Sequence, residues 1–308
     1  MVGGGAAGLS AALILGRARK RTLLVDAGNQ SNLPDPGVGG LLGHEGTPPA
    51  ELYAAGRRDL EELPSVEVRS GVVVDGRGED QDFTVELEDG TTETARKILL
   101  AMGMDYVTAD LPGLTELWGN SVFHCPFCHG WDVRDGAIAM RGNGGAALHG
   151  ALMIRGWTDD VILLTDGPAD LSINDLEKLE DAGIAVDERI LAGLKARDGS
   201  LYAIEFTEGD DLERDAMLVA TQLHQRSDLP ARLGARDAEP TLMAKNALEV
   251  DAFKRTSVTG VFAAGDLAGD SPQVSIAAAS GHAAAIALIQ NLQAEDFGLP
   301  LPPAMLEV

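Results

Sequence analysis

The chain has 308 residues and a formal net charge of −24 at pH 7, because 48 acidic residues outnumber 24 lysines and arginines. Such an acidic surface repels phosphate backbones and anionic lipids, so we expect neither a nucleic-acid partner nor a membrane partner. No apolar run approaches the roughly 18–20 residues that cross a bilayer, and the chain opens on a glycine loop instead of a signal peptide, which predicts a cytoplasmic protein. Domains usually hold about 100–200 residues, so the length predicts two of them.

The first residues predict a strand, a glycine turn, a helix and a second strand. Residues 1–2 lead into the glycine loop at 3–8, an Ala/Leu-rich stretch follows at 9–18, and the apolar run at 22–25 ends at Asp26. The first strand of such a unit normally has four or five apolar residues before the glycines, and here only two precede them. The strand is therefore either short or cut at its start.

Further sheet segments follow before the first domain pauses near residues 110–112. Residues 66–75 and 83–89 run or alternate apolar on either side of a polar turn at 76–82. Residues 97–101 have the composition of a buried strand.

A second strand–glycine–helix–strand unit spans residues 138–164, with glycines at 142–145. Polar, acid-rich segments fill residues 166–216. Apolar strands then follow at 217–220 and 259–264, and an Ala-rich helix is expected at 275–292. This last part has no glycine loop of its own, so we expect it to return and complete the first domain.

The predicted fold class is α/β, with two Rossmann-like, three-layer nucleotide-binding domains, the second inserted into the first. The first domain is expected to comprise residues 1–110 and 243–308, and the central domain residues 111–242. The Pro/Leu-rich tail at 299–308 is expected to be irregular.

The first glycine loop has the spacing of a dinucleotide-binding turn. Gly3, Gly5 and Gly8 lie between a strand and a helix, and Asp26 ends the next strand. In such a turn the first glycine permits the bend, the second lets the backbone approach a pyrophosphate, and the third permits close packing of helix on strand. The acidic residue can accept hydrogen bonds from a ribose. A glycine-rich turn without a ligand is the alternative.

A second candidate cofactor-binding segment lies where the strand at 259–264 stops at Gly265 and Asp266, directly before a helix. Asp266 can hold the ribityl or phosphate region of a flavin, and the following helix can direct its positive end toward the flavin ring. An ordinary turn capped by Asp266 is the alternative.

The stretch His-Cys-Pro-Phe-Cys-His-Gly at 124–130 is the most informative. Cys125 and Cys128 have the spacing of a small redox disulfide, and a neighbouring imidazole can move the proton that thiol–disulfide exchange requires. His129 is the expected base. Zinc bound by these two cysteines with His124 and His129 is a weaker alternative, because four ligands from six consecutive residues would strain a tetrahedral site; we expect no metal. Buried, inert cysteines are the other alternative.

The second glycine loop keeps a pyrophosphate-binding spacing at Gly142, Gly144 and Ala147. Residues 165–167, after the next strand, read Thr-Asp-Gly and supply no arginine to neutralise a 2′-phosphate. Arg141 also occupies a strand position that is usually apolar. These features argue against NADPH. NAD(H) binding through Asp166 remains open. A domain that kept its fold and lost nucleotide binding is equally compatible with the sequence.

Together these motifs resemble the low-molecular-weight thioredoxin reductase group of FAD-dependent pyridine nucleotide–disulfide oxidoreductases. The resemblance covers nearly the whole chain, because the first glycine loop, the C-x-x-C and the Gly-Val-Phe-Ala-Ala-Gly-Asp run at 260–266 occur in the group's order and spacing. Within the group, Cys-Pro-Phe-Cys-His-Gly with a preceding His is most similar to bacterial and fungal dithiol oxidases, which form the disulfide of compounds such as holomycin and gliotoxin.

Three positions depart from true thioredoxin reductases. Those enzymes carry Asp where His129 stands and a His-Arg-Arg run for NADPH where residues 165–167 stand, and both departures favour the oxidase branch. Residues 101–103 read Ala-Met-Gly instead of Ala-Thr-Gly, which weakens one FAD contact and keeps the glycine.

The resemblance implies roles for individual residues. Cys128 would face the flavin, Cys125 would exchange with substrate, His129 would be the base and His124 a possible helper. A homodimer is also implied, because the group is usually homodimeric. FAD would be held by residues of several loops: Gly3, Gly5, Gly8, Asp26, Gly43, His44, Val73, Gly103, Gly265, Asp266, Gln273 and Val274.

The implied reaction is oxidation of a small-molecule dithiol, with two electrons passing from the cysteine pair through FAD to O₂. One alternative is a disulfide reductase driven by NAD(P)H or a ferredoxin, although a chain of charge −24 is a poor electrostatic partner for an acidic ferredoxin. Another is a non-catalytic flavoprotein that senses redox state through the same cysteines. No pattern in the sequence identifies the dithiol.

Overall fold

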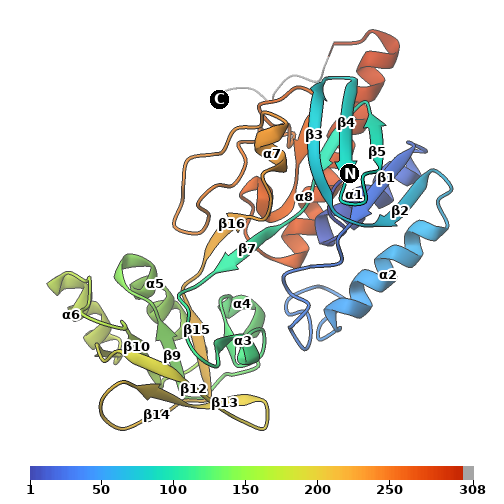
Figure 1. Cartoon of the computed structure of the whole chain (residues 1–308). Coiled ribbons are helices and arrows are strands. Elements are labelled where there is room, and N and C mark those ends of the chain that lie inside the picture. Colours follow the sequence, from blue (N-terminus) through green and yellow to red (C-terminus); the bar gives the residue numbers. More distant parts are fainter. Residues whose placement is uncertain (301–308) are drawn as a thin grey trace. The chain divides into compact units, whose positions relative to one another are not determined.

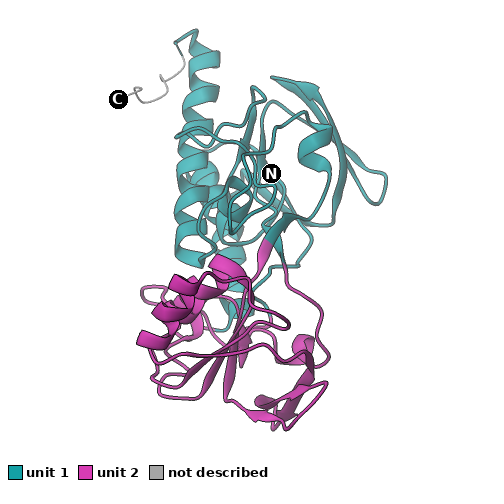
Figure 2. Ribbon diagram, turned by 90° about the vertical axis from the view of Figure 1, so that its left-hand side faces the viewer, with its two compact units in different colours: residues 1–33, 48–106, 223–308 teal, residues 34–47, 107–222 magenta. Residues whose placement is uncertain are grey.

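The computed structural model describes residues 1–300 and divides into two compact units (Figures 1 and 2). Unit 1 contains residues 1–33, 48–106 and the chain from 223 onward, and unit 2 contains residues 34–47 and 107–222. The chain thus leaves unit 1 and returns to it. Most of the tail that the sequence predicts to be irregular lies outside the described residues.

The boundaries of the units differ from the predicted ones at three places. The first domain was expected to pause at residue 110, and unit 1 is left after Tyr106. The expected return to the first domain was residue 243, but unit 1 resumes at Leu223. The reason is packing: Leu229 of helix α7 (Leu229–Arg232) and Leu233 just after it are buried in the core of unit 1. Segment 34–47 belongs to unit 2, which no pattern in the sequence indicated.

Parallel strands and one helix surround the first glycine loop of unit 1, and these are α1 (Ala6–Arg17), β1 (Thr22–Asp26), β2 (Val66–Ser70), β6 (Ile98–Leu100) and β17 (Val261–Ala263). Val2 forms bridges with Val25 of β1 and Leu100 of β6, and so joins the pair β1–β2 to the pair β6–β17. The expected first strand is therefore a single bridging residue.

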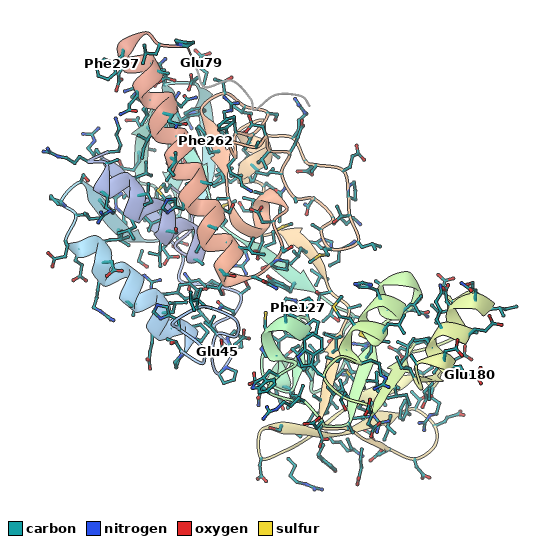
Figure 3. The ribbon with its side chains drawn as sticks, turned by 180° about the vertical axis from the view of Figure 1, so that it is seen from behind. Glu45, Glu79, Phe127, Glu180, Phe262 and Phe297 are labelled. Atoms are coloured by element: carbon teal, nitrogen blue, oxygen red, sulfur yellow. The ribbon has the colours of Figure 1, made fainter. Side chains whose placement is uncertain are left out.

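Helix α8 (Val274–Phe297) crosses α1 at close range. A Cβ on Gly281 of α8 would overlap the carbonyl group of Ala7, so this approach requires glycine. By length and composition α8 is apolar enough to span a membrane, contrary to the sequence-based expectation. Its Ala284, however, packs in a buried cluster with Phe262 of β17, labelled in Figure 3. One side of this helix is therefore part of the core of unit 1.

An antiparallel sheet in unit 1 consists of β3 (Val73–Glu79), β4 (Asp82–Leu87) and β5 (Thr92–Ala95). The turn expected at residues 76–82 is much shorter, because β3 and β4 remain paired as far as Glu79 and Asp82. The remaining elements of unit 1 are α2 (Pro49–Glu61) and η1 (Gly265–Ala268). The paired strands β7 (Met104–Val107) and β16 (Gln222–Gln225) lie where the chain passes from one unit to the other.

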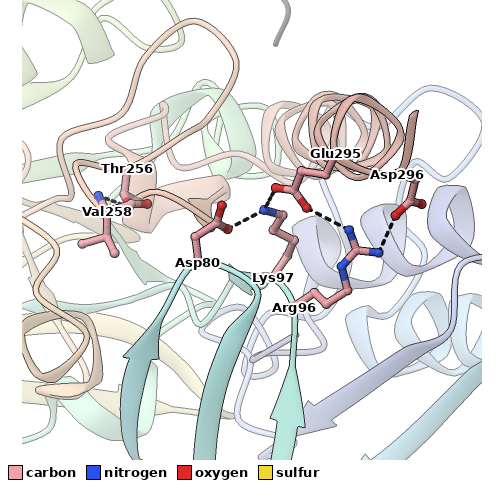
Figure 4. A network of polar contacts seen from close by, with 7 residues as sticks. All are labelled: Asp80, Arg96, Lys97, Thr256, Val258, Glu295 and Asp296. Atoms are coloured by element: carbon pink, nitrogen blue, oxygen red, sulfur yellow. Dashed lines mark hydrogen bonds and ion pairs between the residues drawn. The ribbon is translucent and has the colours of Figure 1, made fainter. Parts of the chain in front are cut away.

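A charged network connects this antiparallel sheet to the end of α8 (Figure 4). The side chain of Lys97 is 2% exposed and pairs with Asp80 and Glu295. Arg96 contacts Glu295 at 2.9 Å and Asp296 at 2.7 Å. A buried ammonium group is tolerated only when it is paired, so these carboxylates offset the cost of burying Lys97.

Unit 2 is built on a five-stranded parallel sheet in the order β11 (Ala185–Asp187), β10 (Val161–Leu164), β9 (Ile138–Arg141), β15 (Ala216–Val219), β8 (Val122–Phe123). Its other elements are α3 (Leu114–Leu117), α4 (Pro126–His129), α5 (Gly144–Ile154), α6 (Ile173–Asp181) and the antiparallel strands β12 (Leu191–Arg197), β13 (Ser200–Phe206) and β14 (Leu212–Glu213).

Alternate residues of the central strands face opposite layers. Ile138 and Met140 pack in one buried cluster with residues of α5 and α6, while Ala139 and Met217 pack in another with residues of β12 and β13. Strands buried on both faces produce this pattern. The predicted α/β class, with Rossmann-like domains, is confirmed.

Candidate functional site

The first glycine loop is tightly packed at Gly3 and Gly8 and open at Gly5. Gly3 has a φ of +102°, and a Cβ there would overlap the carbonyl group of Ala101. A Cβ on Gly8 would overlap the carbonyl group of Gly3. On Gly5, by contrast, a Cβ would find its nearest neighbour, the Gln30 side chain, at 3.7 Å. The backbone at Gly5 is therefore accessible to a pyrophosphate, as the motif requires.

Asp26 is buried and fixes this loop. Its Oδ1 accepts hydrogen bonds from the backbone amides of Gly4 at 3.1 Å and Gly28 at 3.0 Å. Its Oδ2 lies 2.6 Å from Nη2 of Arg57, and the amide of Gln30 donates to both carboxylate oxygens. A carboxylate offers about four acceptor positions, so a ribose hydroxyl would take the place of a movable side chain such as Gln30. The sequence did not indicate Gly4, Gln30 or Arg57.

The junction before α8 is held by a chain of polar contacts. Gly265 has a φ of +72°, and its amide donates to Oγ of Ser280 at 3.0 Å. Ser280 donates to Asp270 at 2.6 Å, and Asp270 is paired with Lys254 at 2.7 Å. These contacts lie within unit 1 and fix the turn that positions Asp266.

Asp266 itself accepts a hydrogen bond from the hydroxyl group of Tyr106 at 2.9 Å. Burial raises the pKa of Asp266 above its usual range, against the opposing effect of this hydrogen bond. Gln273 is the N-cap residue of α8 and Val274 its first residue, so both lie at the positive end of that helix.

The other predicted cofactor contacts are scattered. Gly103 has a φ of +66° and open space where a Cβ would be. The side chain of Val73 is in the core, so only its backbone is available to a ligand. Gly43, with a φ of +80°, and His44 lie in segment 34–47, which is part of unit 2.

The cysteine pair lies where β8 meets α4. Cys125 is the N-cap residue of α4, and Cys128 is in its last turn; the two Sγ atoms are 2.6 Å apart. Cys125 is buried and Cys128 is partly exposed. The structure thus brings both thiols together in unit 2, at the geometry needed for a redox pair.

The two thiols differ in acidity. The hydrogen bond from Cys128, together with the backbone amides of Cys128 and Phe127, lowers the pKa of Cys125 to about 7. The same hydrogen bond, burial and the negative charge of Asp35 raise the pKa of Cys128. In the reduced pair the thiolate therefore resides on Cys125, which is the state a thiol needs for exchange.

The two histidines have different environments. Burial and the charge of His129 lower the pKa of His124 to about 4, so His124 is neutral at neutral pH; it stacks on Trp118 with a centroid distance of 5.9 Å. His129 is 7% exposed and stacks on Phe123 at 5.2 Å. Burial alone would lower the pKa of His129, but Asp35 and the charge on Cys125 raise it overall.

Segment 34–47 packs directly on the cysteine pair. A Cβ on Gly39 would overlap the carbonyl group of Cys128, and a Cβ on Gly119 would lie 2.5 Å from Oδ1 of Asp35. Sequence reasoning missed Asp35, Gly39 and Gly119. The signal that was available is only the run Pro-Asp-Pro-Gly at 34–37, which indicates a turn and nothing about a contact some 90 residues along the chain.

Comparison with known proteins establishes the family. Residues 1–281 match the model for pyridine nucleotide-disulphide oxidoreductases. The chain belongs to this family. Thioredoxin reductase tcpT of Claviceps purpurea is 31% identical to it over 92% of this chain and 90% of that protein. Membership confirms the coarse prediction of a FAD-dependent thiol/disulfide oxidoreductase.

Two solved structures have a similar fold. An oxidoreductase from Agrobacterium tumefaciens has a TM-score of 0.89 and 32% identity, covering 95% of this chain and 97% of its own. HlmI also has a TM-score of 0.89, with 34% identity over 96% of this chain and 92% of its own.

The second glycine loop is held by hydrogen bonds of its own Asn143 side chain. Oδ1 of Asn143 accepts hydrogen bonds from the amides of Gly144 at 2.9 Å and Asp170 at 2.7 Å. Its Nδ2 donates to the carbonyl groups of Thr165 and Pro168. The amides that would face a pyrophosphate are therefore partly used within the loop.

Arg141 and Asp166 complete this internal pairing. The buried guanidinium of Arg141 lies 3.0 Å from Oδ2 of Asp166 and donates to the carbonyl group of Ala109 at 2.8 Å. Oδ1 of Asp166 accepts the amide of Leu191 at 2.9 Å. Asp166, the residue through which NAD(H) binding remained open, thus already has partners.

Proposed function

We propose that this chain is a dithiol oxidase, which uses FAD and the Cys125–Cys128 pair to form a disulfide in a small-molecule dithiol, with O₂ as the terminal acceptor. The observation that carries the proposal is the internal pairing of the second glycine loop. An enzyme whose second glycine loop already has a bound amide and a paired acidic residue needs another electron source than a nicotinamide, and a dithiol substrate at the cysteine pair supplies one.

The residues proposed to bind FAD fit the group. The open backbone at Gly5, the bend at Gly3 and the polar chain behind Gly265 form the cradle that a dinucleotide needs. Asp26 fixes the loop and Asp266 lies at the second junction. When bound, FAD supplies the acceptor for two electrons from the dithiol and their donor to O₂, which yields H₂O₂.

The proposed exchange begins with the oxidised cysteine pair. A substrate thiolate attacks Sγ of Cys125, the bond to Cys128 breaks, and Cys128 leaves with the electron pair. The second substrate thiolate then attacks the substrate sulfur of the mixed disulfide and releases Cys125 as a thiolate. The substrate has lost two electrons and two protons, and the cysteine pair has gained the electrons. Because the pKa of Cys125 is lowered to about 7, Cys125 is a good leaving group.

Oxygen uptake by cysteine variants tests this function. With dithiothreitol as the probe dithiol, the parent protein should consume O₂ catalytically and release an equal amount of H₂O₂. Cys125→Ser and Cys128→Ser should each lose at least about 10³-fold in rate, because each removes one half of a unit that acts together. Both should retain FAD. Undiminished uptake in either variant would contradict the thiol–disulfide mechanism, and a single turnover per site in the parent would instead indicate a redox sensor.

His129→Ala tests the proposed base. Turnover near neutral pH should fall by roughly 10²–10⁴-fold, the usual contribution of a general acid–base group, and the acidic limb of the pH–rate profile should flatten. FAD absorbance provides the folding control. Turnover at the parent rate would transfer the proposed role to His124, although its pKa of about 4 makes it a poor acceptor of a thiol proton at neutral pH.

A disulfide reductase is the second candidate, because several relatives, including the Claviceps purpurea protein, carry the name thioredoxin reductase. Rapid reduction of the flavin by NADPH would support it. Homodimer formation is also part of our proposal, and sedimentation velocity on the purified protein would measure it. The proposed location is the cytoplasm.

A further inference from the structure

We propose that Asp35 is the residue that positions His129, and that Nδ1 of His129 is the atom that exchanges protons with the reacting thiols. This inference rests on the proposed function of the cysteine pair. Asp35 comes from the segment that precedes α2, far from the C-x-x-C in the sequence, but both lie in unit 2. Within the described residues Asp35 makes no hydrogen bond to either cysteine and acts through the imidazole, so it is a positioning residue.

The position of the ring proton follows from the acceptor that it meets. Nε2 of His129 lies 3.2 Å from the carbonyl oxygen of Gly119 and 3.7 Å from Oδ1 of Asp35. Both oxygens can only accept a hydrogen bond or attract a positive charge, so Nε2 carries the hydrogen. In the neutral ring the lone pair is then on Nδ1.

Nδ1 is the part of the ring that the protein leaves without a partner. It is buried and makes no hydrogen bond to the described residues, on a side chain that is 8% exposed. Buried polar atoms almost always have partners, and an exception calls for an explanation. The explanation that we propose is that Nδ1 accepts a proton from a partner that is present only during the reaction, the thiol of a substrate.

The surroundings of the ring hold it in this orientation. Phe123 stacks on it at 5.2 Å with an angle of 15° between the planes. Gly119 has a φ of +80° and no side chain, and a Cβ there would lie 2.5 Å from Oδ1 of Asp35. Because Gly119 has no side chain, the carboxylate of Asp35 can approach the same nitrogen of His129 that faces the carbonyl group of Gly119.

Asp35 also affects the sulfur atoms. The titratable groups around His129 are Asp35, His124 and the two cysteines. Asp35 favours the imidazolium form of His129, whose charge lowers the pKa of Cys125, and its own negative charge raises the pKa of Cys128. One carboxylate thus favours a thiolate on Cys125 and a thiol on Cys128.

The proton balance uses this asymmetry. The first substrate thiol gives its proton to Nδ1 and attacks Cys125; Cys128 leaves as a thiolate and takes that proton, because its pKa is raised. The second substrate thiol gives its proton to Nδ1 and completes the substrate disulfide, releasing Cys125 as a thiolate. Of the two substrate protons, one ends on Cys128 and the other on His129, and both substrate electrons are on the cysteine pair.

Titration of His129 by NMR in the FAD-loaded protein tests the inference without turnover. The chain has six histidines, and His129→Ala assigns the signal. Asp35→Asn should lower the midpoint of the His129 titration by about one pH unit or more, the effect of removing an opposite charge at this distance. Asp35→Glu should restore most of it. Asp132→Asn, which removes the same charge from an exposed position of the same unit, should leave the midpoint unchanged.

A second measurement on the same proteins follows the sulfur atoms. After anaerobic reduction, iodoacetamide labels each cysteine according to its exposure and its thiolate fraction. Asp35→Asn leaves the exposure of both cysteines as it is and should move the ratio of Cys125 to Cys128 labelling toward Cys128 by several-fold, as read by mass spectrometry of the peptides. An unchanged His129 midpoint and labelling ratio in Asp35→Asn would overturn the proposal.

The parent protein alone provides a further check, which covers the case in which the Asp35 variants do not fold. Nitrogen chemical shifts of the neutral ring should show the hydrogen on Nε2, and a hydrogen on Nδ1 would overturn the proposal. Because none of these measurements requires dithiol oxidation, failure of the proposed function and failure of the Asp35 role are distinguishable.

Discussion

The two glycine loops of this chain have similar glycine spacing, but different side chains bind their backbone amides. In unit 1 the loop amide of Gly4 is bound by Asp26 of the next strand, and the backbone at Gly5 remains open. In unit 2 Asn143 of the loop itself binds the amides of Gly144 and of Asp170 outside the loop. Both acidic residues are paired with an arginine, but Arg57 beside Asp26 is partly exposed, whereas Arg141 beside Asp166 is buried. A glycine spacing therefore establishes that a backbone can accept a nucleotide, while the side chains beside it decide whether the loop is available.

The largest expected effect comes from a side chain placed in each loop. Gly5→Leu should yield protein that folds but purifies without flavin, because the Cβ position is free of protein atoms and the longer side chain occupies the pyrophosphate position. Gly145→Leu is the control in the second loop, because a Cβ there meets nothing within 4 Å. It should retain the flavin absorbance of the parent. Equal flavin content in both variants would break the comparison.

A smaller effect on FAD binding is expected to distinguish Asp26 from Asp166. Asp26→Asn should weaken FAD binding by about 10- to 100-fold, because it replaces charged hydrogen bonds that hold the open loop. Asp166→Asn should leave FAD binding unchanged. It should lower the free energy of unfolding by about 2 kcal/mol, because the buried Arg141 loses its carboxylate, a loss moderated by the partial exposure of Asp166.

FAD titration and urea denaturation of the same two variants measure both quantities. Weaker flavin binding in the Asp166 variant, with no change in stability, would contradict the distinction between the loops.

Much of the fold was predictable because it depends on local patterns. Glycines, apolar runs and turn residues that are neighbours in the sequence predict the strand that ends at Asp26 and the long helix after Asp266. They also predict the first helix, which begins at Ala6 and not after Gly8 as expected. Strands β12 and β13 were not predicted, because they lie among polar, acid-rich segments and neither alternates strictly between buried and exposed residues.

The candidate site was predictable only where its residues share a motif. Cys125, Cys128 and His129 are found together in one short run. Asp35 reaches His129 from a loop about 90 residues away, and its approach depends on Gly119, whose lack of a side chain has no meaning until the loop is seen to pack against it. The pairing beside the second loop was indicated in part by Arg141, an arginine in an apolar strand. The hydrogen bonds of Asn143 could not be predicted, because their backbone partners at Thr165, Pro168 and Asp170 come near only in the folded chain.

Anaerobic reduction of the bound flavin is the most direct test of the central claim, that electrons enter through the cysteine pair and not through the second glycine loop. We predict that dithiothreitol bleaches the flavin absorbance of the parent protein, that Cys125→Ser and Cys128→Ser abolish this bleaching, and that NADPH bleaches it slowly or not at all. Rapid, stoichiometric bleaching by NADPH would contradict the account and favour a disulfide reductase, and bleaching by NADH alone would show that Asp166 accepts a ribose despite its pairing with Arg141.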